Sequence, residues 1–110
     1  MYIARWHLTA RFGQKDETLK VLQRWEIDVA HRIGWRPGSL RLVTGSIGAG
    51  DTEIEMEVKI DSLTDLEAAW ADMGRVPYQA EYQKKLADLI VGGTSRWTVH
   101  RVVESDVAAV

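Results

Sequence analysis

Polar and charged side chains alternate with apolar ones along several segments of this 110-residue chain, and two histidines lie in that polar phase. A histidine that is hydrogen-bonded to a glutamate can act as a general base near neutral pH. Two histidines and a carboxylate can instead bind a divalent transition metal. Proton transfer and metal binding are therefore the two chemistries to consider. The polar set consists of Arg5, His7, Thr9, Arg41, Glu53, Glu55, Glu57, Lys59, Arg96, Thr98 and His100.

The segments that carry this set are predicted to be strands, and helices are predicted between them. Alternation with a period of two is typical of a half-buried strand, whereas apolar residues spaced three and four apart indicate a helix. The predicted strands cover residues 2–11, 39–47, 52–61 and 94–103, and the predicted helices cover residues 16–33, 63–73 and 77–91.

Residues at the predicted helix ends support these boundaries. Asp16 is a candidate N-cap of the first helix, and Gly34 follows its last apolar residue as a C-terminal glycine does. Ser62 and Asp65 fit a capping box at the start of the second helix. Pro77 can open the third helix after a break at Gly74.

The element order β-α-β-β-α(α)-β predicts an α+β fold of the ferredoxin-like type. We expect an antiparallel sheet of strand order 4-1-3-2 with the helices on one face. Residues 1–104 form one domain in this interpretation, and residues 105–110 form a C-terminal tail. The polar set then lies on the sheet face that the helices leave uncovered.

Composition excludes several classes of function. The chain has no cysteine, which excludes a disulfide framework, cysteine-ligated zinc or iron–sulfur clusters, and thiol catalysis. Its formal net charge is −2, which argues against binding to nucleic acid phosphates. No apolar stretch is long enough to span a membrane, and no signal peptide is recognisable at the N-terminus. We expect a cytoplasmic protein.

His7 is the central candidate for catalysis. If its strand lies between the third and fourth strands, His7 faces Glu55 or Glu57 on one side and Thr98 or His100 on the other. The catalytic candidates are His7, Glu57 and His100, although a shift of one residue in register would move His100 to the other face. We expect no metal site.

A structural interpretation of the same residues is favoured over the catalytic one. In it, the arginines of the polar set pair with its glutamates on a solvated or dimer-facing surface, and the histidines fill polar positions. Candidate substrate-binding residues are Arg5 and Arg41 on the sheet, together with Trp70, Tyr78 and Tyr82 around the break between the second and third helices. A cleft can open at that break, although ordinary packing is the favoured role of the three aromatic residues.

The element order, the polar sheet face and the segment Leu66–Met73 followed by Pro77-Tyr78-Gln79 together resemble the dimeric α+β barrel superfamily. Nearly the whole chain is covered by this resemblance. Within the superfamily the chain is most similar to NIPSNAP-like and antibiotic-biosynthesis-monooxygenase-like domains, in which a tryptophan, here Trp70, lies on the helix after the third strand.

The resemblance implies a homodimer in which two sheets form a shared barrel with a ligand cavity in each protomer. Activities in the superfamily include cofactor-free oxygenation, heme degradation and isomerisation, so the fold does not decide the function. Heme-degrading members have a histidine on the last helix, where this chain has Ala80-Glu81-Tyr82. We therefore expect no cofactor.

Two hypotheses about function follow. In the first, a homodimeric barrel binds a small, partly apolar organic molecule between sheet and helices and acts as an oxygenase- or isomerase-like enzyme, with His7 transferring a proton. In the second, the protein is a non-catalytic accessory or assembly module whose polar sheet face forms the dimer. A pocket of roughly 300 Å³ or more would favour the first.

Overall fold

A computed structural model describes residues 1–104 of the chain, and the predicted tail at 105–110 lies outside the described residues. The strands and helices follow one another in the predicted order, and two short 3-10 helices, Ala30–Ile33 and Pro37–Ser39, precede the second strand. The elements are β1 (Tyr2–Thr9), α1 (Lys15–Asp28), β2 (Leu40–Thr44), β3 (Glu53–Ile60), α2 (Leu63–Met73), α3 (Gln79–Leu89) and β4 (Arg96–Arg101).

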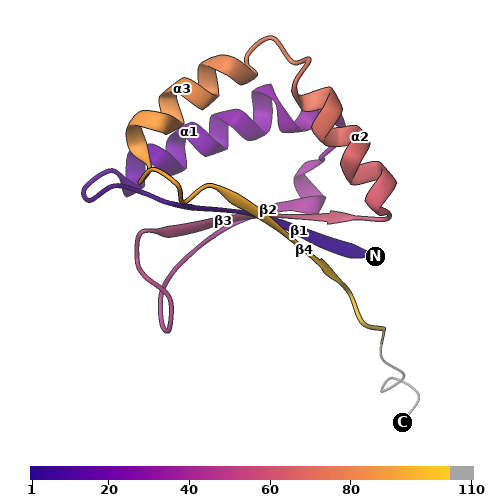
Figure 1. The fold of residues 1–110 in the computed structure, drawn as a ribbon, viewed down its shortest axis with the longest axis horizontal. Coiled ribbons are helices and arrows are strands. Elements are labelled where there is room, and N and C mark those ends of the chain that lie inside the picture. The colour runs from indigo at the N-terminus through magenta and orange to yellow at the C-terminus, as the bar shows by residue number, and fades with distance from the viewer. Residues whose placement is uncertain (105–110) are drawn as a thin grey trace.

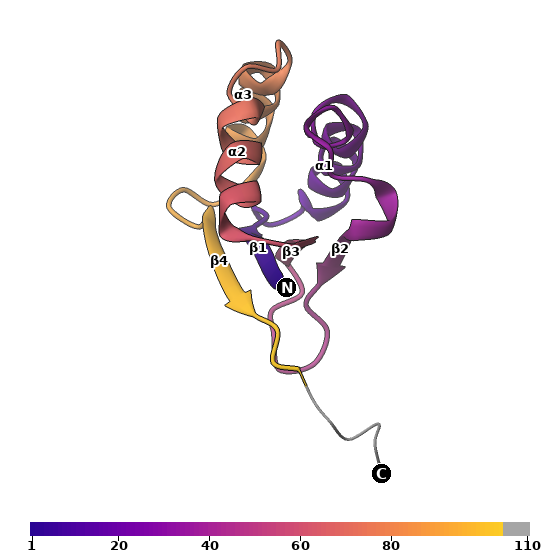
Figure 2. The same ribbon diagram turned by 90° about the vertical axis from the view of Figure 1, so that its right-hand side faces the viewer.

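The four strands form one antiparallel sheet of order β2-β3-β1-β4, which is the predicted order read from the other edge. The helices all lie on one face of this sheet, so the molecule has two layers and one open sheet face (Figure 1). β2 and β4 are the two edges (Figure 2). The predicted α+β, ferredoxin-like class is confirmed.

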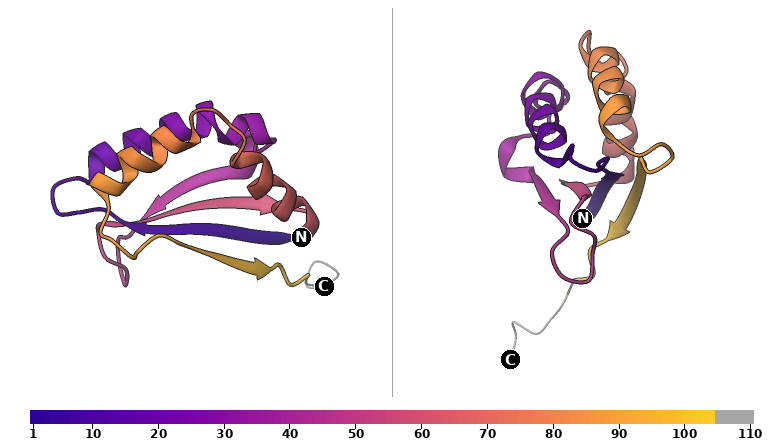
Figure 3. Two further views of the ribbon diagram at one scale, coloured as in Figure 1. Left: turned by 45° about the horizontal axis from the view of Figure 1, so that its top comes forward. Right: turned by 90° about the vertical axis from the view of Figure 1, so that its left-hand side faces the viewer.

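Alternation along the strands decides which side chains meet the helices. Ala4, Trp6 and Leu8 of β1 are buried beneath the helices, and each has a buried apolar partner on β3. The helices contribute the other half of the core, with α1 and α3 running side by side above the sheet and α2 beside its other end (Figure 3). The core residues of α1 and α3 include Leu22, Trp25, Tyr82 and Leu86.

The five tryptophans of the chain form one connected aromatic cluster within this core. Trp6 stacks on Trp97 with ring centroids 6.0 Å apart and planes 7° from parallel. Trp25 and Trp35 contact this pair from the helix side, and the edge of Trp70 meets Trp97 at 5.5 Å. The cluster runs from the fully buried Trp25 to Trp70, which is 39% exposed on α2.

The first helix begins and ends differently from the prediction. Gln14, not Asp16, is the N-cap of α1, because its carbonyl accepts hydrogen bonds from both the backbone nitrogen and the hydroxyl of Thr18. Asp16 lies in the first turn, where its negative charge interacts favourably with the positive end of the helix dipole. The α-helical part stops at Asp28. The following 3-10 turn leads to Gly34, whose φ of 90° confirms the predicted glycine stop.

The other helix ends mostly follow the prediction. The Ser62 hydroxyl accepts a hydrogen bond from the Asp65 backbone nitrogen at 3.1 Å, which confirms the cap of α2, and Gly74 ends that helix. Pro77 is not the first residue of α3, because a turn closed by Gln79 N to Val76 O at 3.1 Å delays the helix start to Gln79. No helix within residues 1–104 is long and apolar enough to cross a membrane.

Candidate functional site

The open face of the sheet carries the polar set, as predicted. Across β1 and β3 the register pairs Arg5 with Glu57 and His7 with Glu55, and across β1 and β4 it pairs His7 with Arg96. Because partners in adjacent strands point to the same side of a sheet, these side chains share the face away from the helices. The catalytic and binding candidates on the sheet therefore share one face, and their individual contacts distinguish them.

Glu57 is bound by two arginines and does not contact His7. Arg5 donates from Nε to one carboxylate oxygen at 3.0 Å, and Arg41 donates from Nε to the other at 2.9 Å. Only 4% of Glu57 is exposed; burial would raise the pKa of its carboxyl group, but the two arginines outweigh burial and lower that pKa. Glu57 thus joins β1, β3 and β2 as an anion with both oxygens occupied.

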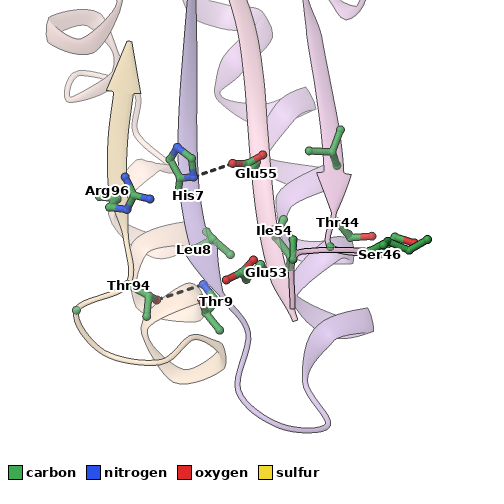
Figure 4. A pocket seen from close by; sticks show the side chains of 15 residues that line it. His7, Leu8, Thr9, Thr44, Ser46, Glu53, Ile54, Glu55, Thr94 and Arg96 are labelled. Atoms are coloured by element: carbon green, nitrogen blue, oxygen red, sulfur yellow. Dashed lines mark hydrogen bonds and ion pairs between the residues drawn. The ribbon is translucent and has the colours of Figure 1, made fainter. Parts of the chain in front are cut away.

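His7 is held between a carboxylate and a hydroxyl. Its Nδ1 lies 2.9 Å from Oε1 of Glu55, and its Nε2 lies 2.7 Å from Oγ1 of Thr98 (Figure 4 shows the contact with Glu55). Glu55 can only accept in its ionised form, so Nδ1 donates to it and Nε2 accepts from the Thr98 hydroxyl when the ring is neutral. The partners thereby fix both the tautomer and the orientation of the ring.

The charge state of His7 is set by its surroundings. Burial lowers the pKa of the imidazole; the Glu55 carboxylate opposes this, whereas Arg96, Arg5 and His100 add to the lowering. The net pKa is below the ordinary value of histidine, so the ring is neutral at neutral pH. A neutral imidazole whose Nδ1–H is oriented by a carboxylate presents Nε2 as a base, which is the arrangement that general-base catalysis requires.

A pocket of about 570 Å³ opens on the same face, at the end of the sheet where β1 leads into α1. His7 and Glu55 belong to its lining, as do Thr94 and Arg96 on the β4 side (Figure 4). The loop between β2 and β3 bends away from the helices and supplies the far wall (Figure 1). This loop carries Gly45, Gly48 and Gly50, and the sequence did not predict its part in the pocket.

His100 stands apart from this pocket. In the register it is opposite Ile3, whereas the β4 residue opposite His7 is Arg96, so His100 lies further along the sheet and is exposed. It keeps the predicted face but contributes nothing to the pocket lining. Among residues 1–104, no three histidine, aspartate or glutamate side chains are placed to share a metal ion.

The three aromatic candidates on the helices do not form a single cleft. Trp70 packs on Trp97, whereas Tyr78 and Tyr82 line a smaller hollow of about 340 Å³ between α1 and α3. The Tyr82 hydroxyl donates to Asp28, and burial followed by this contact raises the pKa of the tyrosine. The tryptophan cluster and aliphatic core fill the layer between sheet and helices, so the larger pocket lies on the opposite face from the one predicted.

Sequence reasoning named the neighbours of His7 only as alternatives. Glu55 and Thr98 prove to be the contacts, and the exact register that selects them depends on hydrogen bonds between strands far apart in the sequence. The pocket wall formed by the β2–β3 loop had one available signal. A glycine-rich turn that directly follows a strand of the polar set must lie at the end of that polar face.

Comparison with known proteins places the chain by its structure. A NIPSNAP family protein from Agrobacterium tumefaciens superposes with a TM-score of 0.74 at 18% identity, covering 96% of this chain and 94% of the other. SnoaB, a cofactor-independent oxygenase from Streptomyces nogalater, superposes as a point mutant with a TM-score of 0.61 at 16% identity, covering 96% of each chain. A candidate antibiotic biosynthesis monooxygenase from Deinococcus radiodurans gives 0.61 at 15% identity, covering 96% and 95%.

The chain has the fold of these proteins. The resemblance predicted from the sequence is therefore confirmed at the level of the fold. No protein-family model matches the sequence, and no curated protein matches it closely enough to count as a relative. Because the identities are low, the shared fold leaves the activity to be argued from the site.

Proposed function

We propose that this protein is a homodimeric α+β barrel that binds a small organic molecule in the pocket on the open sheet face and moves a proton with His7. One observation carries the proposal: His7 lies in the pocket wall as an oriented neutral base, with Glu55 at Nδ1 and Thr98 at Nε2. A bound C–H or O–H acid that replaces the Thr98 hydroxyl at Nε2 would meet the lone pair of the imidazole.

The open face supports the dimer. Its ion pairs are already formed, and side chains such as Ile47, which is 97% exposed, add apolar surface at its end. A second sheet packed on this face would bury that surface and turn the open pocket into a closed one. Water would then be excluded from His7, which strengthens its electrostatic contacts with Glu55 and with a bound molecule.

The proposed reaction begins with removal of a proton from an activated carbon. The C–H bond breaks, an Nε2–H bond forms on His7, and the electron pair moves onto an adjacent carbonyl oxygen. Return of the Nε2 proton to another carbon gives an isomerisation. In an oxygenation without a cofactor, dioxygen forms a C–O bond with the carbanion, and the Nε2 proton returns to the resulting peroxide anion to give a hydroperoxide. SnoaB is a cofactor-independent oxygenase of the same fold, which favours this class of chemistry.

Deuterium exchange tests the proton transfer directly. The protein is incubated in D₂O with acetylacetone, beta-tetralone and anthrone, while mass spectrometry follows deuterium uptake and an oxygen electrode follows dioxygen. We expect accelerated exchange or oxygen uptake with the wild type, loss in His7→Gln, and full activity in His31→Gln, whose exposed histidine lies on the helix side. Equal rates for the wild type and His7→Gln contradict the proposal.

A second candidate function is a non-catalytic assembly module, and Glu57 favours it. The buried carboxylate has both oxygens bound by arginines, and among residues 1–104 no buried side-chain polar atom lacks a partner. Burying this carboxylate against a partner would therefore not leave it as an unpaired charge, which is the costly case. Native mass spectrometry and the deuterium assay together distinguish the module from the enzyme. A dimer that retains no small molecule and shows no accelerated exchange supports the module.

A further inference from the structure

Arg96 differs from the other arginines of the open face. It lies on β4 directly opposite His7 in the register, and its side chain lines the pocket on the side of His7 away from Glu55 (Figure 4). Arg5 and Arg41 each form an ion pair with Glu57. Across residues 1–104, Arg96 forms no ion pair, so the pocket contains a guanidinium group without a carboxylate partner.

The two carboxylates of the pocket have partners of their own. Glu55 accepts from His7 at 2.9 Å, and Glu53 accepts from the backbone nitrogen of Gly50 at 3.0 Å. Both glutamates are on β3, which is separated from β4 by the whole of β1. The negative charge therefore lies on the β3 side, and the uncompensated positive charge lies at the β4 edge.

The opposite wall of the pocket carries aliphatic side chains beside the hydroxyl groups of Thr44 and Ser46. Val43 on β2 and Ile47 and Ala49 in the β2–β3 loop line it, and Val43 and Ile47 are 36% and 97% exposed. The pocket therefore has a cation at its β4 side, the imidazole of His7 in the middle, and aliphatic side chains at its β2 side. A molecule that matches this arrangement has an anionic head and an apolar body.

We infer that the pocket binds a small amphipathic carboxylic acid, whose carboxylate pairs with Arg96 while its apolar body lies against Ile47 and Val43. This inference names the ligand class for the proposed function and rests on the same pocket. The guanidinium group suits a carboxylate because its planar N–H fork can donate two parallel hydrogen bonds. Arg96 is then the residue that selects acids over neutral molecules of equal shape.

A matched pair of probes tests this selection. Naphthoate and naphthamide have the same rings, and only naphthoate is charged, so the ratio of their dissociation constants isolates the contribution of the carboxylate. We expect naphthoate to bind the wild type about tenfold more tightly, the gain typical of one charge-assisted contact. The ratio should fall to about one in Arg96→Gln. It should persist in Arg101→Gln, which removes a charge from the same strand but on the other face of the sheet.

Amide chemical shifts locate the binding. Naphthoate should shift Ile47 and Thr94 in the pocket, because these lie at its opposite walls. Shifts confined to Lys20 and Lys85 would place the acid in the hollow between α1 and α3 and overturn the inference. It is equally overturned when neither probe binds, or when naphthoate keeps its preference in Arg96→Gln.

The inference and the proposed function fail in different measurements. If the preference for naphthoate depends on Arg96 while His7→Gln leaves deuterium exchange unchanged, the acid-binding site is supported and proton transfer by His7 is contradicted. If exchange depends on His7 while both probes bind equally, proton transfer by His7 is supported and the inferred carboxylic acid ligand is wrong. Thermal unfolding of each variant confirms that it is folded before either comparison is made.

Discussion

Arg5 donates from Nε to Oε2 of Glu57 at 3.0 Å, and the two residues are direct partners in the pairing of β1 with β3. The same carboxylate accepts from Arg41 on β2 at 2.9 Å, so one buried anion holds three of the four strands together on the open face. Polar groups on a sheet surface seldom contribute much to stability, but burial changes that balance because an unpaired charge there is costly.

Glu57→Gln should therefore destabilise the fold. The amide keeps the shape but leaves two arginines without an anion, and we expect the free energy of unfolding to fall by about 1–3 kcal/mol. Urea unfolding followed by tryptophan fluorescence measures this change. Glu67→Gln, an exposed glutamate on α2, is the control and should change stability little. Equal effects of the two substitutions would contradict the role of Glu57.

The stability of the protein should depend on pH through His7. Its folded pKa is lower than its unfolded pKa, so the unfolded chain binds more protons and the stability from neutral His7 is present above the unfolded value of about 6.5. That stability is lost as pH falls through the lower folded value. Urea midpoints across this window should fall more steeply for the wild type than for His7→Gln. Parallel curves would show that His7 is not the group that titrates.

Much of the fold could be predicted because it follows from local signals. The alternation in β1 and β3, the Ser62 cap and the glycine stop at Gly34 each depend on neighbouring residues, and all of them are confirmed. The N-cap at Gln14 was missed because its side chain does not cap the helix; the cap uses its carbonyl, which every residue has.

The candidate site could be predicted only in part. Alternation assigned His7 and its neighbours to one face, but the choice between Glu55 and Glu57 as its partner depends on the register, and register is set by contacts between distant segments. Trp70 illustrates the limit from the other side. Its helix and its spacing were predicted correctly, yet its packing partner is Trp97, which is on a strand 27 positions later.

The β2–β3 loop that walls the pocket should depend on Gly45. A Cβ at this position would lie 1.8 Å from the carbonyl oxygen of Gly50, so Gly45→Ala forces the two ends of the loop apart. We expect a loss of about 1–3 kcal/mol in the free energy of unfolding and weaker binding of naphthoate. Gly92→Ala is the control, because a Cβ there meets nothing within 4 Å. Unchanged stability of Gly45→Ala would mean that the loop adapts freely.

Trp70→Leu separates packing from ligand binding on the helix side. The edge of Trp70 meets Trp97 at 5.5 Å, and such aromatic pairs contribute about 0.5–1.5 kcal/mol beyond the area they bury. Unfolding in urea should show a loss of roughly this size, whereas Tyr78→Leu, at a similarly exposed aromatic residue that has no ring contact with the cluster in the described chain, should lose less. Naphthoate affinity should stay unchanged in Trp70→Leu, because the acid binds on the other face of the sheet. A drop in naphthoate affinity without a loss of stability would show that Trp70 contributes to ligand binding.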